Sequence, residues 1–322
     1  MKAAVLSEYG VPRYGDFPTP TAQPGSVVVD VRAASLNAID VALAAGRHPL
    51  APKELPVVAG IEGIGTVDGH KRIYFVRPTP PYGSMAETTL VPENNILDVP
   101  DGIDDARAAA LGNGGMAALM PLRDCAAIRE GESVLILGAT GVVGQLAVQC
   151  ASALGAGQIV AAGRSAEALS VCAAQGATSQ IVLDDHTPPE ELRASVPAGF
   201  DVVIDYVGGA PAAAACRSLA PRGRLVQVGD RAGAEIPLPV APLRVSGGSV
   251  TGFMQTHYGM EAMRSAYETL VRWTLEARIV VATSTTALHD LELAWQAYGG
   301  AREKAVLLVS DARRLARRGE TR

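Results

Sequence analysis

A glycine-rich turn, GATGVVG at residues 138–144, is the feature that most constrains what this chain can fold into. The apolar run VLIL leads directly into it, and a helical pattern follows at once. Against the GxGxxG spacing of dinucleotide-binding turns, the three glycine positions are held by Ala139, Gly141 and Gly144. Gly141 lets the backbone approach a pyrophosphate, and Gly144 lets the helix pack closely on the strand. A tight strand-to-helix turn without a ligand is the alternative.

Strands and helices alternate around this turn, which predicts an α/β domain. Short apolar runs separated by helical patterns are typical of a parallel sheet covered on both faces, as in the doubly wound Rossmann fold. The first hundred residues differ, because frequent prolines and glycines there favour a small β-rich unit. The predicted strands of the parallel sheet are 133–137, 158–162, 180–184, 201–206, 223–229 and 249–254.

The composition is that of a globular protein of about two domains. With 322 residues, 48% hydrophobic and 19% charged, the chain has enough apolar surface for a sizeable core. A net charge of −5 gives no basic field for nucleic acid, so we expect a small-molecule partner. The four cysteines show no zinc spacing, and neither a secretory leader nor a membrane span is evident. We therefore expect a cytoplasmic location.

Arg164 stands where proteins that bind NAD place an acidic residue, twenty positions beyond Gly144. A carboxylate there would repel the 2′-phosphate of NADPH, whereas an arginine offers it a charge-assisted fork. Gly163 leaves space beside the arginine, and Ser165 adds a hydroxyl and a backbone N–H at a new helix start. We therefore predict a preference for NADPH. An ordinary surface arginine after a strand is the alternative.

Motifs spread over nearly the whole chain occur in one order: MKAAVLSEYG, SLNAID, GIEGIG, AALGNGGMAAL, LGATGVVGQLAVQCASALGA, VVIDYVGG and RLVQVG. In these segments the chain resembles the medium-chain dehydrogenase/reductase superfamily and is most similar to its zinc-independent quinone oxidoreductase branch. The resemblance implies a split GroES-like catalytic domain, residues 1–105 and 255–322, around a Rossmann domain at 106–254. It also implies a homodimer or homotetramer.

The resemblance further predicts that no metal is bound. Zinc-dependent members of the superfamily carry a cysteine ligand where this chain has Asn37, and a histidine ligand where it has Ile61. An amide and an isoleucine cannot replace a thiolate and an imidazole as zinc ligands. The four-cysteine lobe that binds structural zinc is missing from the sequence as well. We therefore expect an acceptor that is already electrophilic, such as a quinone or an enone.

Asn37, Asp40 and His48 are the candidate catalytic residues. Asn37 and Asp40 match an Asn-x-x-Asp pattern of the family, which implies that they position the nicotinamide ribose or the substrate. A helix-start cap or a polar link to the backbone is the alternative for both. The tyrosines that often follow this aspartate in the family are replaced by Ala42 and His48. We expect His48 to donate a proton or a hydrogen bond to the reduced acceptor, unless it is a solvated loop residue and water does this.

The same resemblance assigns further residues to the cofactor. Tyr206 and Gly229 follow predicted strands, at the edge of the sheet where ligands bind. Asn113 precedes the Rossmann part and Lys304 lies in the C-terminal return, where a structural role is the alternative for each. The complete predicted cofactor site comprises Ala139, Thr140, Gly141, Val142, Val143, Gly144, Gly163, Arg164, Ser165, Tyr206, Val207, Gly229, Gly252, Phe253, Asn113 and Lys304.

Together these expectations describe a zinc-independent, NADPH-dependent oxidoreductase that transfers hydride to a quinone or another conjugated carbonyl acceptor. One alternative is an enoyl or alkenal reductase that acts on carbon–carbon double bonds in a single pathway. The other is a non-catalytic NADPH-binding protein, which the loss of the tyrosines after Asp40 keeps open. Such a protein would bind NADPH without turning over any quinone or enone.

Overall fold

The computed structural model describes residues 1–183, 192, 194–299 and 302–309, and the chain divides into two compact units. The first unit contains Met1–Asn113 together with the chain from Val281 onward. The second unit contains Gly114–Val280. The second unit thus begins after residue 113, where the sequence placed the boundary at 105, and it ends at residue 280, where the sequence placed the boundary at 254.

Two helices account for this difference in boundaries. Helix α2 (Asp105–Ala110) belongs to the first unit, where Asp105 accepts hydrogen bonds from Arg32 at 2.6 Å and from Arg72 at 2.8 Å. Helix α9 (Gly259–Leu275) belongs to the second unit, where it buries one apolar face. The chain consequently returns to the first unit only after α9 has ended.

The second unit contains the predicted parallel sheet. Its strands are β9 (Ser133–Leu137), β10 (Gln158–Gly163), β11 (Ser179–Val182), β12 (Phe200–Asp205), β13 (Leu219–Gln227) and β14 (Ser249–Gly252). Among the described residues they form a six-stranded sheet in the order β11-β10-β9-β12-β13-β14, with every neighbouring pair parallel. This is the strand order of the Rossmann fold. The predicted α/β class is confirmed.

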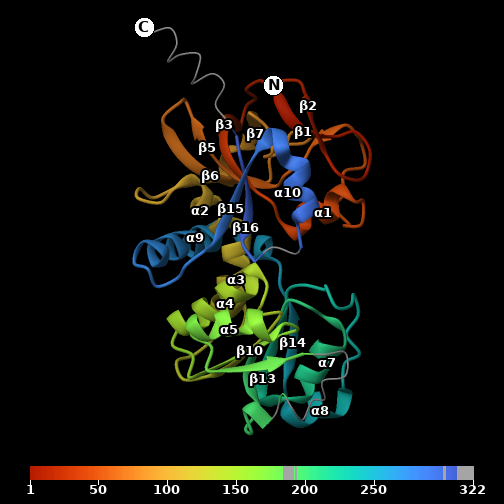
Figure 1. The fold of residues 1–322 in the computed structure, drawn as a ribbon, viewed down its shortest axis with the longest axis vertical. Coiled ribbons are helices and arrows are strands. Elements are labelled where there is room, and N and C mark those ends of the chain that lie inside the picture. The colour runs from red at the N-terminus through yellow and green to blue at the C-terminus, as the bar shows by residue number, and fades with distance from the viewer. Residues whose placement is uncertain (184–191, 193, 300–301, 310–322) are drawn as a thin grey trace. The chain divides into compact units, whose positions relative to one another are not determined.

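Helices cover both faces of this sheet. The main ones are α3 (Met116–Met120), α4 (Val142–Ala153), α5 (Ala166–Ala174), α7 (Gly209–Arg217) and α8 (Val240–Ser246). Helices α4 and α5 run along β9 and β10, and α7 and α8 run along β13 (Figure 1). Because parallel crossovers are right-handed and the strand order reverses beside β9, the two pairs of helices lie on opposite faces. Buried side chains such as Leu135, Val160 and Val203 form the core beneath them.

The first unit is built from antiparallel strands contributed by both ends of the chain. Its strands are β1 (Lys2–Leu6), β2 (Arg13–Asp16), β3 (Ser26–Ser35), β4 (Val57–Val58), β5 (Glu62–Val67), β6 (Lys71–Val76), β7 (Thr88–Pro92), β8 (Ile96–Asp98), β15 (Thr283–Ala287) and β16 (Lys304–Leu308). The larger sheet has the order β15-β16-β3-β5-β6-β8, with β7 also paired to β3, and the smaller sheet is β2-β1-β4. Only β15 and β16 run parallel among these described pairs.

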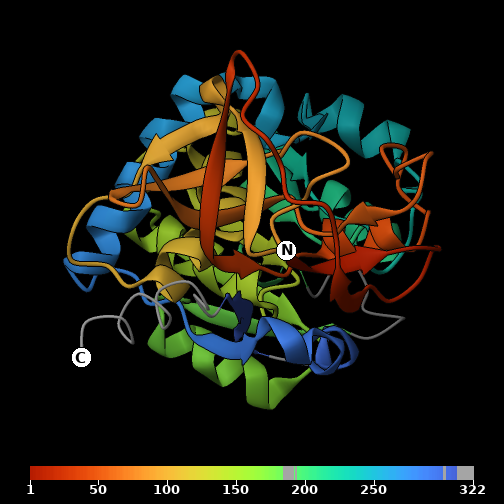
Figure 2. The same cartoon turned by 90° about the horizontal axis from the view of Figure 1, so that it is seen from above.

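The pairing of β16 with β3 is what brings the C-terminal part of the chain to the N-terminal part. The two views show the C-terminal strand, coloured blue, beside the red and orange strands of the N-terminal part (Figures 1 and 2). In this antiparallel pair Val306 lies opposite Ser35. Helix α1 (Ala38–Ala44) follows β3, and helix α10 (Leu291–Ala297) precedes β16. As a result, the residue that begins β16 lies beside the segment that joins β3 to α1.

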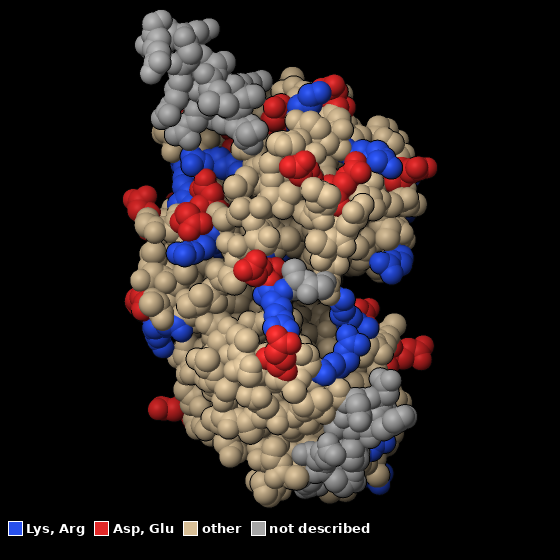
Figure 3. All heavy atoms as spheres, in the orientation of Figure 1, with Lys and Arg blue, Asp and Glu red and all other residues tan. Residues whose placement is uncertain are grey.

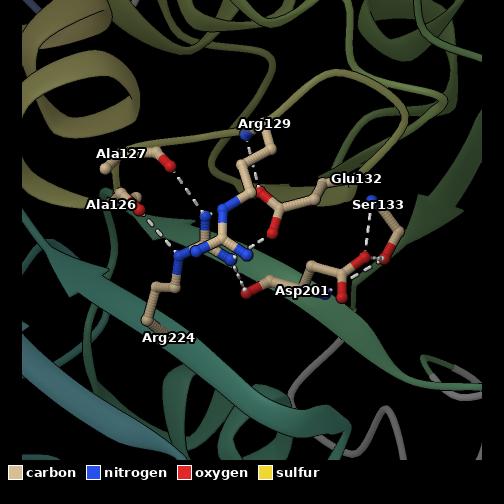
Figure 4. Close-up of polar contacts among 7 residues, drawn as sticks. All are labelled: Ala126, Ala127, Arg129, Glu132, Ser133, Asp201 and Arg224. Atoms are coloured by element: carbon tan, nitrogen blue, oxygen red, sulfur yellow. Dashed lines mark hydrogen bonds and ion pairs between the residues drawn. The ribbon is translucent and has the colours of Figure 1, made fainter.

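A charged cluster fixes the amino-terminal edge of the parallel sheet (Figure 4). Arg224 of β13 contacts Glu132 at 2.6 Å and donates hydrogen bonds to the carbonyl oxygens of Ala126 at 2.7 Å and Asp201 at 3.1 Å. The hydroxyl of Ser133 donates to the Asp201 carboxylate at 2.8 Å. The Arg224 guanidinium lowers the pKa of Glu132 below its usual range. Since ligands of such sheets bind at the opposite edge, this cluster has a structural role.

On the face shown in Figure 3, acidic and basic side chains are interspersed over both units. The whole chain carries 28 Lys and Arg residues and 33 Asp and Glu residues, so neither sign dominates. Within the described residues, no helix combines the length and the apolar character needed to cross a bilayer.

Candidate functional site

The carboxyl edge of the parallel sheet brings together most of the predicted cofactor residues. Because the strands are parallel, they all end at this edge, which is where ligands of open α/β sheets bind. It contains the turn after β9, the residues after β10 and β12, and the residues at the ends of β13 and β14. The predicted residues gathered there are 139–144, 163–165, 206–207, 229 and 252–253.

The turn after β9 presents backbone N–H groups that are free to bind an anion. Gly138 has a φ of 82°, and the amide of Gly141 donates to Gly138 O at 3.2 Å, which closes the turn. Helix α4 then begins without a side-chain cap, and the amides of Val142, Val143 and Gly144 make no hydrogen bond with the described residues. Unpaired amides and the partial positive charge of a helix N-terminus fit a phosphate group.

Two glycines of the turn differ in what a side chain would meet. A Cβ on Gly144 would overlap the carbonyl oxygen of Gly138 and lie 2.7 Å from Ala139 Cα, so α4 can pack on the turn only with glycine there. A Cβ on Gly141 would lie 3.6 Å from the same oxygen, which is an ordinary contact. The described part of the chain therefore gives no steric reason for glycine at 141, whereas a bound pyrophosphate does.

The end of β10 packs against this turn. The amide of Ala139 donates to Ala162 O at 3.0 Å and is thus not available to a ligand. A Cβ on Gly163 would lie 2.6 Å from the Thr140 side chain. Close packing against Thr140 is therefore one reason for glycine at this position, and the space for a 2′-phosphate beside it stays a prediction.

Arg164 is exposed at the end of β10, and it forms no ion pair or hydrogen bond with any residue that the structure describes. Ser165 caps helix α5, because its Oγ accepts a hydrogen bond from the amide of Ala168 at 3.2 Å. The hydroxyl hydrogen of Ser165 can still be donated. An unpaired guanidinium beside a hydroxyl donor is suited to a phosphate monoester.

Tyr206, Val207 and Gly229 are largely engaged within the protein. The Tyr206 hydroxyl donates to Ala117 O at 2.9 Å, and burial raises the pKa of Tyr206 well above its ordinary value. The amide of Val207 donates to Asp205 Oδ1 at 2.9 Å. A Cβ on Gly229 would lie 2.6 Å from Tyr206 O. These residues shape the edge of the sheet, and their hydrogen-bond donors are already used.

Gly252 and Phe253 lie at the end of the edge strand β14. Gly252 is exposed, and no heavy atom of the described residues lies within 4 Å of the place its Cβ would take. The amide of Phe253 donates to Gln227 O at 2.8 Å, and its ring centroid lies 5.5 Å from that of Tyr258. Backbone contact of Phe253 with a cofactor would thus use its carbonyl oxygen rather than its amide.

A buried polar cluster occupies the first unit, and Glu62 is its centre. Glu62 is 0% exposed, and its carboxylate accepts hydrogen bonds from Ser35 Oγ, Asn37 Nδ2, Tyr74 OH and Asn113 N. The distances from Tyr74 and Asn37 are 2.6 and 2.9 Å. These donors come from β3, from the start of α1, from β6 and from the segment after α2. One carboxylate therefore joins four segments.

A close backbone approach completes the cluster. Gly112 has φ −58° and ψ −116°, which turns the chain after α2 towards Glu62. A Cβ on Gly112 would overlap the Glu62 carboxylate and lie 2.5 Å from Tyr74 Cε2. Glycine at this position is consequently what allows the amide of Asn113 to reach Glu62.

The carboxamide of Asn37 is fully engaged within the cluster. Its Nδ2 group faces Glu62 Oε1 at 2.9 Å and Asp40 Oδ2 at 3.1 Å, the two shortest of its contacts. Its Oδ1 accepts hydrogen bonds from Lys304 Nζ and, at 3.4 Å, from Asn113 Nδ2. Asn37 is 2% exposed. It is therefore placed to hold other groups in position rather than to offer its own donors to a substrate.

Asp40 links the start of α1 to the segment before β5. Its Oδ2 accepts from the amide of Asn37 at 2.8 Å, and its Oδ1 accepts from the amide of Ile61 at 3.1 Å. The first contact is the reach-back bond of a capping box. The helix-start cap and backbone link that the sequence left open for Asn37 and Asp40 are thus both present in the structure.

Lys304 is buried and belongs to the same cluster. Its Nζ donates to Leu36 O at 3.0 Å and to Asn37 Oδ1. Burial lowers the pKa of Lys304, and the nearby charges of Glu62 and Asp40 partly oppose this. The sequence assigned Lys304 to the cofactor, but two of its three N–H groups bind the first unit itself.

Burial raises the pKa of Asp40 to about 7, with a further contribution from the charge of Glu62 and opposing contributions from Asn37 and Lys304. Because the folded state holds this proton more tightly than the unfolded state, stability is greatest below the unfolded pKa of about 4 and falls as pH rises to about 7. Asp40→Asn removes the titrating group. We expect the stability of the wild type relative to this variant to fall by about 2 kcal/mol between pH 5 and 8.

Urea unfolding of both proteins at a series of pH values measures this difference. The hydrogen bond lost in Asp40→Asn lowers the free energy of unfolding by an amount that does not change with pH. The titration of Asp40 is therefore measured by how the difference in free energy between the two proteins changes with pH. Parallel stability curves for the two proteins would mean that Asp40 titrates as an ordinary carboxyl.

His48 lies in the loop after α1, away from this network of hydrogen bonds. Its Nδ1 accepts from the amide of Leu50 at 3.1 Å, so the neutral ring carries its hydrogen on Nε2. It makes no hydrogen bond with Glu62, Asn37 or Lys304 among the described contacts. Its role as a donor to the acceptor stays a prediction.

Three members of the polar cluster could not be identified as site residues from the sequence. Ser35, Glu62 and Tyr74 carry no recognisable spacing, although a charged residue within the strand GIEGIG is a signal of a buried and paired group. In residues 1–183, 192, 194–299 and 302–309, no group of three or more His, Cys, Asp or Glu side chains is arranged to hold a metal ion.

Two family models match the chain, one in each unit. The alcohol dehydrogenase GroES-like domain matches residues 23–74, and the zinc-binding dehydrogenase domain matches residues 142–276. The first range covers β3, α1 and Glu62, and the second begins at the first residue of α4.

Individual relatives agree with these models. Prostaglandin reductase-3 of Bos taurus is 30% identical over 289 residues, which are 85% of this chain and 75% of the relative. The quinone oxidoreductase of Pseudomonas aeruginosa is 32% identical over 244 residues, 72% of this chain and 74% of the relative. Among solved structures, the quinone oxidoreductase from Thermus thermophilus, also described in its complex with NADPH, has a TM-score of 0.81 at 30% identity and covers 96% of this chain and 100% of its own.

Proposed function

Because the chain belongs to the medium-chain dehydrogenase/reductase superfamily, in its NADPH quinone oxidoreductase branch, we propose that it transfers hydride from NADPH to a quinone or another conjugated carbonyl acceptor. The coarser activity, that of an NADPH-dependent oxidoreductase, follows from its relatives. The observation that carries the proposal is that the amides at the start of α4 and the Arg164 guanidinium have no partner among the described residues.

NADPH, when bound, supplies the hydride. The free amides of Val142, Val143 and Gly144 would hold its pyrophosphate, and Arg164 would hold its 2′-phosphate. Gly252 leaves open backbone at the end of β14. The chain's contribution to the reaction is then to orient the cofactor, exclude water and provide a proton for the acceptor oxygen.

Zinc independence is part of the proposal. Ile61 offers no ligand atom, and the carboxamide of Asn37 is committed to Glu62, Asp40 and Lys304. These residues do not fit a zinc ion, which takes thiolate, imidazole or carboxylate ligands in a tetrahedral site. Hydride transfer to a conjugated acceptor suits such a site, because the acceptor's own carbonyl oxygen takes up the charge.

Reduction of a carbon–carbon double bond is the second candidate, because one relative is named a prostaglandin reductase and not a quinone oxidoreductase. Cofactor oxidation measured over quinones, enals and enoyl thioesters tests the proposed class. Deuterium from labelled NADPH would be retained on the β-carbon of an enone product. Binding of NADPH without oxidation over the whole panel would point instead to a non-catalytic binding protein. A cytoplasmic location and a dimeric or tetrameric assembly stay predictions from the sequence.

Arg164→Ala is expected to weaken NADPH binding by about ten- to a hundredfold and to leave NADH binding nearly unchanged, because a charge-assisted contact with the 2′-phosphate is lost. Fluorescence titration with both cofactors measures the change. Arg264→Ala, which removes an exposed arginine of α9, is the matched control. Equal losses for NADPH and NADH, or no loss for either, would remove Arg164 from the cofactor site.

A further inference from the structure

In the buried cluster of the first unit, nearly all donors and acceptors of the side chains form hydrogen bonds with other residues of that unit. Glu62 accepts four hydrogen bonds, and both oxygens of Asp40 accept backbone amides. The carboxamide of Asn37 is bound at both ends. Among the described contacts, the Nδ2 group of Asn37 is engaged and every oxygen of the Glu62 and Asp40 carboxyl groups already faces a donor.

Lys304 differs from the rest of the cluster in two respects. An ammonium group has three donors, of which Leu36 O and Asn37 Oδ1 take two, and the third has no acceptor among the described residues. Lys304 is also 6% exposed, whereas Asn37 and Asp40 are 2% exposed and Glu62 is 0% exposed. Of these four side chains, Lys304 is therefore the most exposed, and one of its N–H groups has no acceptor among the described residues.

The surroundings of Lys304 also make its proton easier to release than that of an ordinary lysine. Burial lowers its pKa, and the nearby charges of Glu62 and Asp40 oppose this in part. The two fixed contacts of Nζ hold the third N–H in one direction. A charged donor with a defined direction and a weakened hold on its proton has the properties of a general acid.

We propose that Lys304 is a catalytic acid that protonates the acceptor when it is reduced. The inference rests on the proposed hydride transfer to a conjugated carbonyl. As hydride adds to the acceptor, its π electrons move to the carbonyl oxygen. That oxygen then forms an O–H bond while the Nζ–H bond of Lys304 breaks and leaves its electron pair on nitrogen. The neutral amine recovers a proton from water after the product has left.

Lys304→Arg separates this role from a structural one. The guanidinium keeps the positive charge and can donate to Leu36 O and Asn37 Oδ1, but it does not release a proton at any working pH. We expect kcat to fall about a hundredfold and the decline of kcat at alkaline pH to disappear, with the NADPH dissociation constant unchanged. Lys71→Arg is the matched control, because Lys71 is exposed on β6 of the same unit and pairs with Asp98.

A second variant, Lys304→Ala, tests the same role without requiring that an arginine side chain fit into the cluster. In Lys304→Ala, small primary amines are expected to restore part of kcat in a saturable manner that depends on the pKa of the amine. Lys71→Ala should show no such rescue. An amine that only refilled the cavity and restored the contacts to Leu36 O and Asn37 Oδ1 would rescue kcat without regard to its pKa, so a dependence of the rescue on amine pKa identifies proton donation.

A measurement without cofactor or acceptor tests the same residue independently. Reductive methylation with labelled formaldehyde, followed by NMR over a range of pH, gives the pKa of Lys304 beside that of Lys71. A wild type that oxidises NADPH with no acceptor on the panel would contradict the proposed function but not this titration. A Lys304→Arg variant as active as Lys71→Arg, an absence of amine rescue, or an ordinary pKa for Lys304 would overturn the inference itself.

Discussion

Replacing Glu62 with alanine is expected to lower the free energy of unfolding by about 3–5 kcal/mol. The substitution removes a buried carboxylate that accepts hydrogen bonds from Ser35, Asn37, Tyr74 and Asn113. It leaves those donors without their acceptor, and breaking a buried set of paired groups by removing one member costs far more than losing a surface contact.

Chemical denaturation of the wild type, Glu62→Ala and Glu62→Gln measures this effect. The amide variant keeps the shape and an acceptor oxygen, so we expect an intermediate loss. Glu54→Ala, at an exposed position of the same unit, should change stability by no more than about 0.5 kcal/mol. NADPH affinity should be retained in Glu62→Ala, because the phosphate-binding turn belongs to the second unit. A loss below about 1 kcal/mol would mean that Glu62 is not the centre that joins the four segments.

Gly144→Ala is expected to destabilise the protein by about 3 kcal/mol, the second largest effect. Its new Cβ would overlap Gly138 O and crowd Ala139, both of which are backbone atoms that cannot move aside as a flexible side chain can. A glycine to alanine change inside a helix normally stabilises it by about 1 kcal/mol. A loss of stability here is thus diagnostic of the close packing of α4 against the turn.

Gly141→Ala is the matched counterpart in the same turn. Its Cβ meets nothing closer than 3.6 Å, so stability should change by less than about 0.5 kcal/mol. NADPH affinity should fall about tenfold or more, because the methyl group would occupy the place where the pyrophosphate approaches the backbone. Thermal unfolding and cofactor titration on both variants separate the two roles. Full NADPH affinity in Gly141→Ala would show that the turn binds no pyrophosphate at this position.

Much of the second unit could be predicted from the sequence, because its signals are local. The run from Ser133 to Leu137 is apolar throughout most of its length and forms β9 with the predicted bounds. Helix α4 begins at Val142, directly after the glycine-rich turn, as its pattern indicates. Neighbouring residues determine such elements, and a parallel sheet of this kind gathers its strand ends at one edge whatever the side chains are.

The roles of single residues within that edge were less predictable. Gly163 was expected to leave room for a phosphate, and only the structure shows that it also makes room for Thr140, which lies 23 positions earlier in the chain. Tyr206 was expected to touch the cofactor, which stays a prediction, and only the structure shows that its hydroxyl donates to Ala117 O. Both contacts join segments that no local pattern connects.

The sequence by itself determined the alternating Rossmann pattern, the glycine-rich turn before α4 and the position of Arg164, because each depends on residues that are close together in the chain. Only the tertiary structure decided that Glu62 is the centre of a buried cluster, and that one N–H of Lys304 in this cluster has no acceptor in the part of the chain that the structure describes. Residues from β3, β5, β6, the segment after α2 and β16 meet there, and they are separated by up to 269 positions, from Ser35 to Lys304. Hydrogen bonds over such separations form only when the strands pair. Neither the periodicity of the sequence nor the spacing of its residues can therefore predict them.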